Sequence, residues 1–198
     1  MGWSRPPLVS DLEGKLIAFG DSNSATPGQN GTTVWPELMD AAYPLLTMSN
    51  SAAIGSATAA GLNAAKADIV YPQIDGGQPF NLVVIAAGTN DLAANVDAAT
   101  IYADLTGMSS GCQAEGALTI ITTVVHGAGY SGPQQTQRAA LNALIMANTA
   151  GANGVADTST AVGTAGAEFS DDYHMSNSGQ TRFKNSVAAK AIQVVEAA

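Results

Sequence analysis

A serine, a histidine and an aspartate that could act together in nucleophilic catalysis stand near the two ends of this 198-residue sequence. Ser22 occurs in "IAFGDSNSATPG", where three apolar residues run into a polar segment. His174 occurs in "SDDYHMSNSG", three residues after Asp171 and just before a segment of helical pattern. A histidine can take the proton of a serine hydroxyl, and a carboxylate can fix the histidine tautomer and stabilise the imidazolium. These residue types predict a nucleophile with its base, provided that the fold brings them together.

Each of these residues also has an ordinary structural interpretation. Glycine, aspartate, serine and asparagine are the residues that turns favour, so residues 20–23 also fit a simple strand-to-loop turn. The acids before His174 also fit a surface loop. The chemical interpretation depends on whether Ser22 lies at the carboxyl edge of a sheet, which is where open α/β sheets place their sites.

One further histidine and one further serine motif compete for the same roles. His126 ends the apolar run "TIITTVVHGAGYSG" with no acid near it in the sequence, which favours a pocket wall and leaves it as the reserve base. Ser109 stands in "GMSSG", which formally matches Gly-x-Ser-x-Gly. A nucleophile elbow joins a strand to a helix. Here a helical stretch precedes the motif and an apolar run from Leu118 follows it, so Ser109 is not the expected nucleophile.

The segment "GAGYSG" at residues 127–132 matches Gly-x-Gly-x-x-Gly, a pattern that binds a dinucleotide when it joins a strand to a helix. Pro133 follows the third glycine and indicates that the helix begins there, which weakens this alternative. No metal site is expected. Two separated histidines and one cysteine offer no zinc-like spacing, and the acids are not grouped as in a calcium loop.

Composition limits the class of protein and of partner. With 46% apolar residues, the chain is long enough to bury a full core, and we expect one domain over residues 1–198. Sixteen acidic residues against seven basic ones argue against nucleic-acid and anionic-membrane partners, which need clustered lysine and arginine. No signal core or membrane span is visible, and the single Cys112 excludes an intrachain disulfide. The compartment and the oligomeric state stay open.

Apolar, β-branched runs alternate with alanine-rich stretches of helical period. The runs lie at residues 16–19, 45–48, 82–86, 118–125 and 155–156, and residues 176–198 read as a closing helix. This alternation predicts the α/β class: a three-layer α/β/α sandwich with a central parallel sheet of about five strands. The loops that follow the strands, near Gly20, Asn50, Gly88, His126 and Asp157, would then share one edge of the sheet.

Four segments, in order along the chain, resemble the GDSL-like, or SGNH, hydrolase family. They are "FGDSNS", "SNSAAIGSATAAGL", "IAAGTNDL" and "SDDYHMSNSG", and with the two apolar residues before the first block they stretch from residue 17 to residue 179. A Gly-Asp-Ser triplet alone is common by chance, whereas four blocks in sequence form a strong signal. Asn23 stands where the family's name-giving leucine would be, which affects the wall near the nucleophile rather than the mechanism.

The resemblance implies a role for one or more residues of each block. Ser22 would be the nucleophile, and Asp171 and His174 would complete the triad. The oxyanion hole would consist of the backbone N–H groups of Ser22 and Gly55 and the side-chain amide of Asn90. The substrate pocket is expected to be lined by Asn23, His126 and Tyr173.

The expected activity is that of a serine hydrolase that cleaves carboxylic esters through a Ser22 acyl-enzyme on a single flavodoxin-like α/β domain. We expect short acyl or O-acetyl groups, on a glycan or another small molecule, as substrate, with no cofactor and no nucleic-acid or membrane partner. One alternative is a non-catalytic carbohydrate-binding or structural module on the same fold. The other is a dinucleotide-binding protein that uses Gly127–Gly132.

Overall fold

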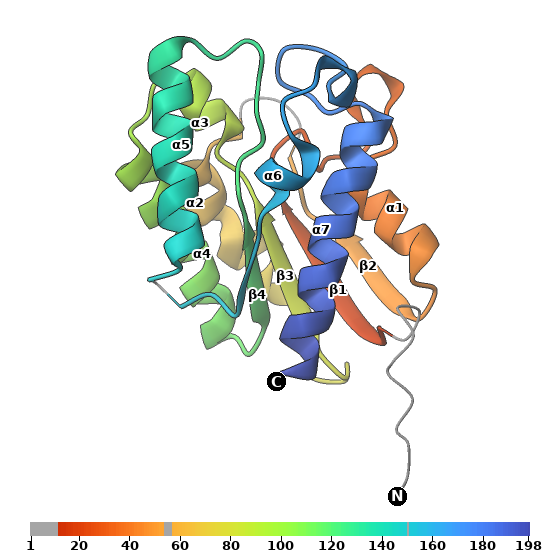
Figure 1. Ribbon diagram of the computed structural model, residues 1–198. Coiled ribbons are helices and arrows are strands. Elements are labelled where there is room, and N and C mark those ends of the chain that lie inside the picture. The colour runs from red at the N-terminus through yellow and green to blue at the C-terminus, as the bar shows by residue number, and fades with distance from the viewer. Residues whose placement is uncertain (1–11, 54–56, 150) are drawn as a thin grey trace, which may run out of the picture.

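The computed structural model describes residues 12–53, 57–149 and 151–198, and these residues form one five-stranded sheet with helices on both faces (Figure 1). The strand order is β2-β1-β3-β4-β5, and every neighbouring pair is parallel. The strands are β1 (Gly14–Gly20), β2 (Leu46–Asn50), β3 (Asn81–Ala86), β4 (Leu118–Thr122) and β5 (Gly154–Ala156). The predicted α/β/α sandwich with a parallel sheet of about five strands is therefore confirmed.

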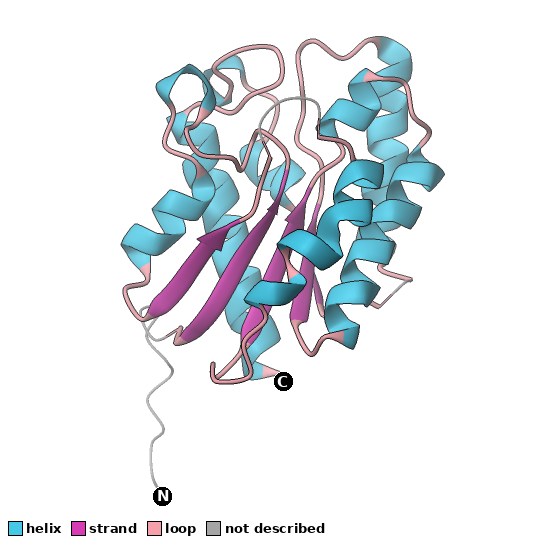
Figure 2. Ribbon diagram, turned by 180° about the vertical axis from the view of Figure 1, so that it is seen from behind, coloured by secondary structure: helices cyan, strands magenta, loops and turns pink. Residues whose placement is uncertain are grey.

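The helices divide into two layers, one on each face of the sheet. One face packs against α2 (Ala59–Ile69), α3 (Thr89–Ala93), α4 (Ala98–Ala114) and α5 (Gly132–Ala147), and Figure 2 brings this face forward. The other face packs against α1 (Trp35–Ala42), α6 (Thr158–Val162) and α7 (Asn177–Glu196). The connections among the described residues contain the short 3-10 helices η1 (Gln29–Gly31), η2 (Tyr71–Gln73) and η3 (Gly166–Glu168). No helix within the described ranges combines the length and the apolar character that crossing a membrane requires.

Side chains along the central strands alternate between two cores, as the two-residue period of a strand requires. The core under α2, α4 and α5 receives Ile17, Phe19, Val83 and Ile85. The core under α1 and α7 receives Leu16, Ala18, Leu82 and Val84. None of these side chains has exposed surface, which explains why the sequence of each strand is continuously apolar. Burial of each large apolar side chain contributes about 1.5–3 kcal/mol, so these two cores hold the sheet and its helices together.

One predicted strand is shorter than its apolar run. Residues 118–125 predicted a strand as far as Val125, but β4 ends at Thr122. The side chain of Asn142, in α5, binds both the N–H and the C=O of Val124, at 2.8 and 2.9 Å. Because β5 has only three residues, the backbone beyond β4 finds this partner outside the sheet.

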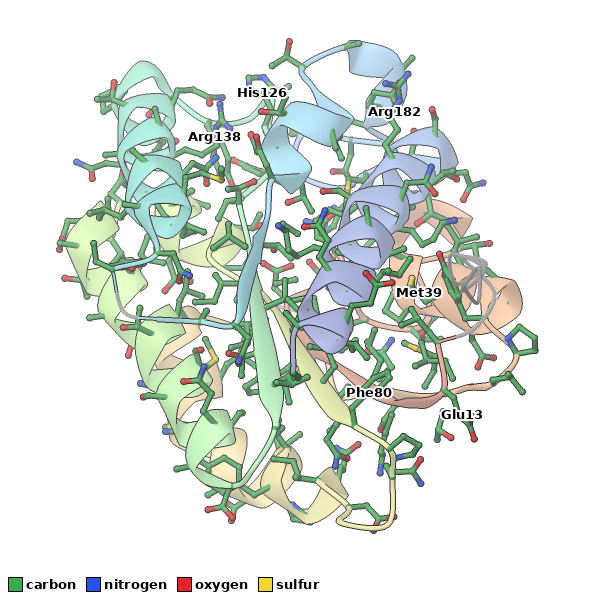
Figure 3. The ribbon with its side chains drawn as sticks, turned by 60° about the horizontal axis from the view of Figure 1, so that its bottom comes forward. Glu13, Met39, Phe80, His126, Arg138 and Arg182 are labelled. Carbon is green, nitrogen blue, oxygen red and sulfur yellow. The ribbon has the colours of Figure 1, made fainter. Side chains whose placement is uncertain are left out.

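All five strands run in one direction, so their carboxyl ends lie at one edge of the sheet. The loops that leave this edge follow Gly20, Asn50, Ala86, Thr122 and Ala156. His126, four residues beyond β4, lies toward this end of the molecule, whereas Phe80 and Glu13, which precede β3 and β1, lie toward the opposite end (Figure 3). The edge after the strands is therefore the place to look for a site.

Gly20 ends β1 so close to β3 that a side chain has no room there. A Cβ atom at Gly20 would lie 2.2 Å from the carbonyl oxygen of Ala86. The same oxygen accepts the backbone N–H of Asp21 at 3.1 Å. The direction in which the chain leaves β1 toward Ser22 therefore depends on this close approach.

Gly20→Ala should lower the free energy of unfolding by about 1–3 kcal/mol, because the backbone of one strand has to move to accommodate the methyl group. Chemical denaturation measures the loss. Gly132→Ala is the matched control, since a Cβ atom at Gly132 would meet nothing within 4 Å. The control should change stability by less than about 0.5 kcal/mol. A Gly20→Ala protein as stable as the control would show that the two strands can separate freely.

Candidate active site

Ser22 lies in the first turn after β1 and is nearly buried, with 6% of its surface exposed. Its Oγ lies 3.0 Å from Nε2 of His174, which stands 152 positions later in the sequence. His174 belongs to the segment between η3 and α7. A separation of 3.0 Å is an ordinary hydrogen-bond length, so the hydroxyl and the imidazole lie within reach of proton transfer.

Asp171 contacts the imidazole on its other side. Its Oδ2 and Oδ1 atoms lie 2.8 and 2.9 Å from Nδ1 of His174. Oδ1 also accepts the backbone N–H groups of Tyr173 and His174, each at 2.8 Å. A carboxylate at Nδ1 favours the tautomer that carries its proton there, which leaves Nε2 as the acceptor that faces Ser22.

The carboxyl of Asp171 is held in its ionised form. Partial burial alone would raise its pKa. Hydrogen bonds from the N–H of Tyr173, from His174 and from the amide of Asn30 outweigh that effect and lower the pKa to about 2. Over the pH range in which most proteins are folded, Asp171 therefore carries a negative charge that can stabilise an imidazolium at His174.

Asn30 is a residue of the site that sequence reasoning missed. Its Nδ2 donates to Oδ2 of Asp171 at 2.7 Å and to Oγ of Ser170 at 3.3 Å. Asn30 has a φ angle of 55°, a left-handed conformation that asparagine adopts more readily than most residues. Its neighbourhood, "TPGQNGTT", predicts a turn and holds no signal for a contact with residues about 140 positions away.

Asn90 lies in the first turn of α3, directly beyond β3, and its Nδ2 donates to the carbonyl oxygen of Ala57 at 2.9 Å. The preceding residue, Thr89, donates its backbone N–H to Oδ2 of Asp21 at 3.4 Å. The loops after β1 and β3 are thus joined one residue before Ser22 and one residue before Asn90. This contact places the Asn90 amide at the same edge as Ser22. Gly55, the other predicted oxyanion donor, lies outside the described residues.

Two of the predicted pocket residues are occupied by contacts within the protein. Asn23 is only 7% exposed, and its side-chain amide binds the backbone on both sides of His174. The hydroxyl of Tyr173 donates to the carbonyl oxygen of Gly129 at 3.1 Å, and its ring packs against Tyr130 with centroids 5.4 Å apart. The Asn23 amide therefore faces the backbone around His174, and the Tyr173 side chain faces the loop at Gly129 and Tyr130.

His126, the third predicted pocket residue, is partly exposed beyond β4. Its ring meets Phe169 edge-on with centroids 6.0 Å apart (Figure 3 shows His126 near Arg138). Burial and the positive charge of Arg138 lower the pKa of His126. The imidazole beside the Ser22 hydroxyl is that of His174, so the reserve base is not the one in contact with the serine.

The competing motifs occupy structural positions. Ser109 lies inside α4, is 3% exposed, and places its Oγ 2.7 Å from Oγ1 of Thr119. The glycine pattern at residues 127–132 ends where α5 begins, as Pro133 indicated. A Cβ atom at Gly129 would lie 2.5 Å from the ring of Tyr173, so that ring covers the loop that a pyrophosphate would need. Neither motif provides the geometry of its family.

Metal-ligating side chains do not cluster in the part of the chain that the structure describes, where no three histidine, cysteine, aspartate or glutamate residues could hold an ion. Cys112 is buried in α4, and burial raises the pKa of its thiol to about 11. Such a thiol is protonated at neutral pH and is a poor nucleophile. The groups that the structure brings together for chemistry are thus the hydroxyl, the imidazole and the carboxylate.

Residues 18–182 match the model of the GDSL-like lipase/acylhydrolase family. The chain belongs to this family. The resemblance that four sequence blocks indicated is confirmed, and so is the class of enzyme, an esterase or acylhydrolase. A search of curated proteins found no match.

Solved structures share the fold of this GDSL-like hydrolase. A member of the lipolytic G-D-S-L family from Veillonella parvula has a TM-score of 0.74 at 18% identity, over 88% of this chain and 96% of that one. Axe2, an acetylxylan esterase from Geobacillus stearothermophilus, has a TM-score of 0.72 at 18% identity, over 95% and 96%. The esterase EstA from Pseudoalteromonas sp. has a TM-score of 0.66 at 17% identity, over 90% and 97%. At such low identity these similarities concern the fold.

Asn30→Gly should raise the pKa of the Asp171 carboxyl, because it removes the amide that donates to Oδ2. Glycine accepts the φ angle of 55° at this position without strain. We expect the pKa to move from about 2 toward the ordinary value of 3.8. The NMR chemical shift of the carboxyl carbon, followed against pH, measures the change.

The same substitution should lower the free energy of unfolding at neutral pH and make that free energy fall less on acidification. Because folding lowers the pKa of Asp171, its carboxylate adds stability above the unfolded pKa, and that contribution disappears as the pH falls through the folded value. A folded pKa closer to the unfolded value makes this contribution smaller, so less of it remains to be lost in acid. Chemical denaturation at neutral and at acid pH measures both free energies. Asn95→Gly, at another left-handed residue with a φ angle of 62°, is the control. An unchanged titration of Asp171 in Asn30→Gly would remove Asn30 from the site.

Proposed function

We propose that this GDSL-like hydrolase cleaves carboxylic esters of short acyl groups through an acyl-enzyme on Ser22. One observation carries the proposal: Ser22 Oγ lies 3.0 Å from His174 Nε2, while Asp171 Oδ2 lies 2.8 Å from His174 Nδ1. A hydroxyl, an imidazole and a carboxylate in this order form a chain that can remove the hydroxyl proton. Membership of an acylhydrolase family supports the same reaction.

In the first half of the reaction, Nε2 of His174 takes the proton of Ser22 as Oγ attacks the ester carbonyl carbon. The ionised Asp171 stabilises the imidazolium and keeps its own charge throughout. The tetrahedral intermediate then collapses: the carbon–oxygen bond to the alcohol breaks, and the imidazolium gives its proton to the leaving oxygen. In the second half, His174 takes a proton from water as the water oxygen attacks the acyl carbon. The bond from that carbon to Ser22 Oγ then breaks, the imidazolium returns its proton to Oγ, and the free acid leaves.

The oxyanion of each tetrahedral intermediate requires hydrogen-bond donors at the same edge of the sheet. We assign the side-chain amide of Asn90, in the first turn of α3, as one of these donors. An amide is neutral and does not titrate, so it can serve as a donor over the whole pH range. We assign the backbone N–H groups of Ser22 and Gly55 as the other donors, on the resemblance of their sequence blocks to those of the family.

The proposed substrates are esters of short acyl groups, including O-acetyl groups on carbohydrate. A long acyl chain needs a deep apolar trough, and the loops between the described strands and helices form no long amphipathic insertion that would build one. The structural similarity to an acetylxylan esterase supports acetylated carbohydrate as the first substrate class to test. The low density of positive charge, seven lysine and arginine residues in the sequence, favours neutral over anionic esters.

Ser22→Ala should abolish hydrolysis of a short-chain chromogenic ester such as p-nitrophenyl acetate, because no oxygen remains to form the acyl-enzyme. Ser109→Ala is the matched control and should keep wild-type kcat, since Ser109 lies buried inside α4. Intact-mass and peptide analysis after treatment with an organophosphonate should find the adduct on Ser22. If the active wild-type protein is labelled on Ser109 or on another serine, that serine and not Ser22 is the nucleophile. A protein that neither hydrolyses esters nor reacts with the phosphonate would be a binding module.

Asn90→Ala should lower kcat by about 100- to 1,000-fold with little change in KM, which is the usual effect of losing one oxyanion donor. Steady-state kinetics on the same ester measures both constants. Asn63→Ala, which removes an amide from α2 that binds Asp104, is the control. Full activity of Asn90→Ala would exclude its amide from the transition state.

A further inference from the structure

We propose that Asn23 is a positioning residue, whose side-chain amide holds the peptide segment that carries His174 in register with the neighbouring nucleophile. The inference rests on the proposed function of Ser22 and His174. It proposes that Asn23 aligns these two groups, in place of the predicted role of Asn23 as a residue that lines the substrate pocket. Asn23 does not touch the reacting atoms and acts through the backbone of the segment around His174.

The two ends of the Asn23 amide bind the residues on either side of His174. Nδ2 donates to the carbonyl oxygen of Tyr173 at 3.2 Å, and Oδ1 accepts the backbone N–H of Met175 at 3.2 Å. One planar group thus binds the peptide units before and after the catalytic imidazole. Because two points are fixed, the segment can neither slide along the loop nor rotate about a single hydrogen bond.

Hydrogen bonds hold the backbone of Asn23 in place, so its side-chain amide can fix the position of the segment around His174. Its backbone N–H donates to Oδ1 of Asp21 at 3.1 Å, and its carbonyl oxygen accepts Nε2 of Gln180 at 2.9 Å. The residue is 7% exposed, which keeps water from competing for these bonds. Asn23 is also joined covalently to Ser22, so the position of the nucleophile and that of the amide are tied together.

Other contacts shape the segment around His174 without linking it to the residue next to Ser22. The bonds from His174 and Tyr173 to Asp171 lie within the turn. The bond from Gly129 to Asp172, at 3.2 Å, joins the turn to the loop after β4. The two hydrogen bonds of the Asn23 amide, by contrast, join the segment around His174 directly to the residue that follows Ser22.

The chemistry of the position explains why asparagine suits it. A leucine, which the family name places after the serine, has a similar size but neither donates to a carbonyl oxygen nor accepts an N–H. An aspartate would accept from Met175, but when ionised it would oppose the carbonyl oxygen of Tyr173 and lie near the carboxyl of Asp21. Asparagine is the residue of this length that carries one donor end and one acceptor end.

The test compares Asn23→Leu with Asn81→Leu. Asn81 is the matched control because it is 8% exposed, and its amide binds both the carbonyl oxygen and the N–H of Asp75, at 2.8 and 3.0 Å. It lies at the start of β3, at the end of the sheet opposite the site. Each variant loses two hydrogen bonds of a buried amide, so both should unfold at lower temperature than the wild type. Asn23→Ala, which introduces no bulk, serves if the leucine prevents folding.

We expect Asn23→Leu to lower kcat by about 10- to 100-fold with KM unchanged, since an ångström of misplacement between reacting groups can cost about 100-fold. The rate of phosphonate labelling of Ser22 should fall by the same factor. Amide hydrogen exchange at Met175 should become faster. Asn81→Leu should leave kcat, the labelling rate and the exchange at Met175 at their wild-type values.

Three results would overturn the inference: wild-type kcat in the Asn23 variants, an equal loss of kcat in Asn81→Leu, or unchanged exchange at Met175. A wild-type protein that neither hydrolyses esters nor reacts with the phosphonate contradicts the proposed function instead. In that case the exchange measurement alone decides whether Asn23 holds the segment, because it needs no reaction.

Discussion

The geometry of the site depends on the contact between the first residue of α1 and the first turns of α7. Trp35 is fully buried and packs against Phe183 with ring centroids 5.6 Å apart. Its backbone N–H donates to Oε1 of Gln180 at 2.9 Å, and its indole N–H donates to Oγ of Ser24 at 2.8 Å. Nε2 of Gln180 in turn reaches the carbonyl oxygen of Asn23. The loop after β1 and the start of the last helix are therefore joined as one unit, although the chain separates them by about 150 positions.

Apolar packing and hydrogen bonding contribute differently to this contact: the first supplies stability, and the second supplies direction. Burial of a large apolar side chain contributes about 1.5–3 kcal/mol and has no preferred direction. A hydrogen bond contributes about 0.5–1.5 kcal/mol net, but leaving a buried amide without its partner costs about 1–3 kcal/mol. The aromatic pair thus brings the two segments together, and the amides of Asn23 and Gln180 exclude all but one relative placement of them. Catalytic alignment needs the second property more than the first.

The two aspartates near the site show how the environment divides the roles of identical side chains. Burial raises the pKa of Asp21 and outweighs its hydrogen bonds from Asn23 and Thr89. For Asp171 the balance is reversed, since the hydrogen bonds it accepts outweigh its partial burial and lower its pKa to about 2. The Asp21 carboxyl accepts backbone N–H groups from Asn23, after β1, and from Thr89, after β3. Asp171 is the carboxyl that stays charged beside His174, which is the charge the proposed mechanism requires.

The sequence predicted the parallel sheet, the closing helix and the shared edge of the loops, because apolar periodicity reports directly which faces of strands and helices are buried. It also singled out Ser22, Asp171 and His174, because nucleophiles, bases and acids are recognised by residue type and only two histidines compete for the role of base. It missed Asn30, the contacts of Gln180, and the early end of β4 at Thr122, beyond which Asn142 binds the backbone. A carboxamide that reaches across the molecule to a carboxylate or to backbone has no period and no motif, and asparagine and glutamine are common in turns and on surfaces. The residues proposed for the chemistry could thus be singled out from their types and motifs, whereas those that position them become visible only when both ends of each hydrogen bond are known.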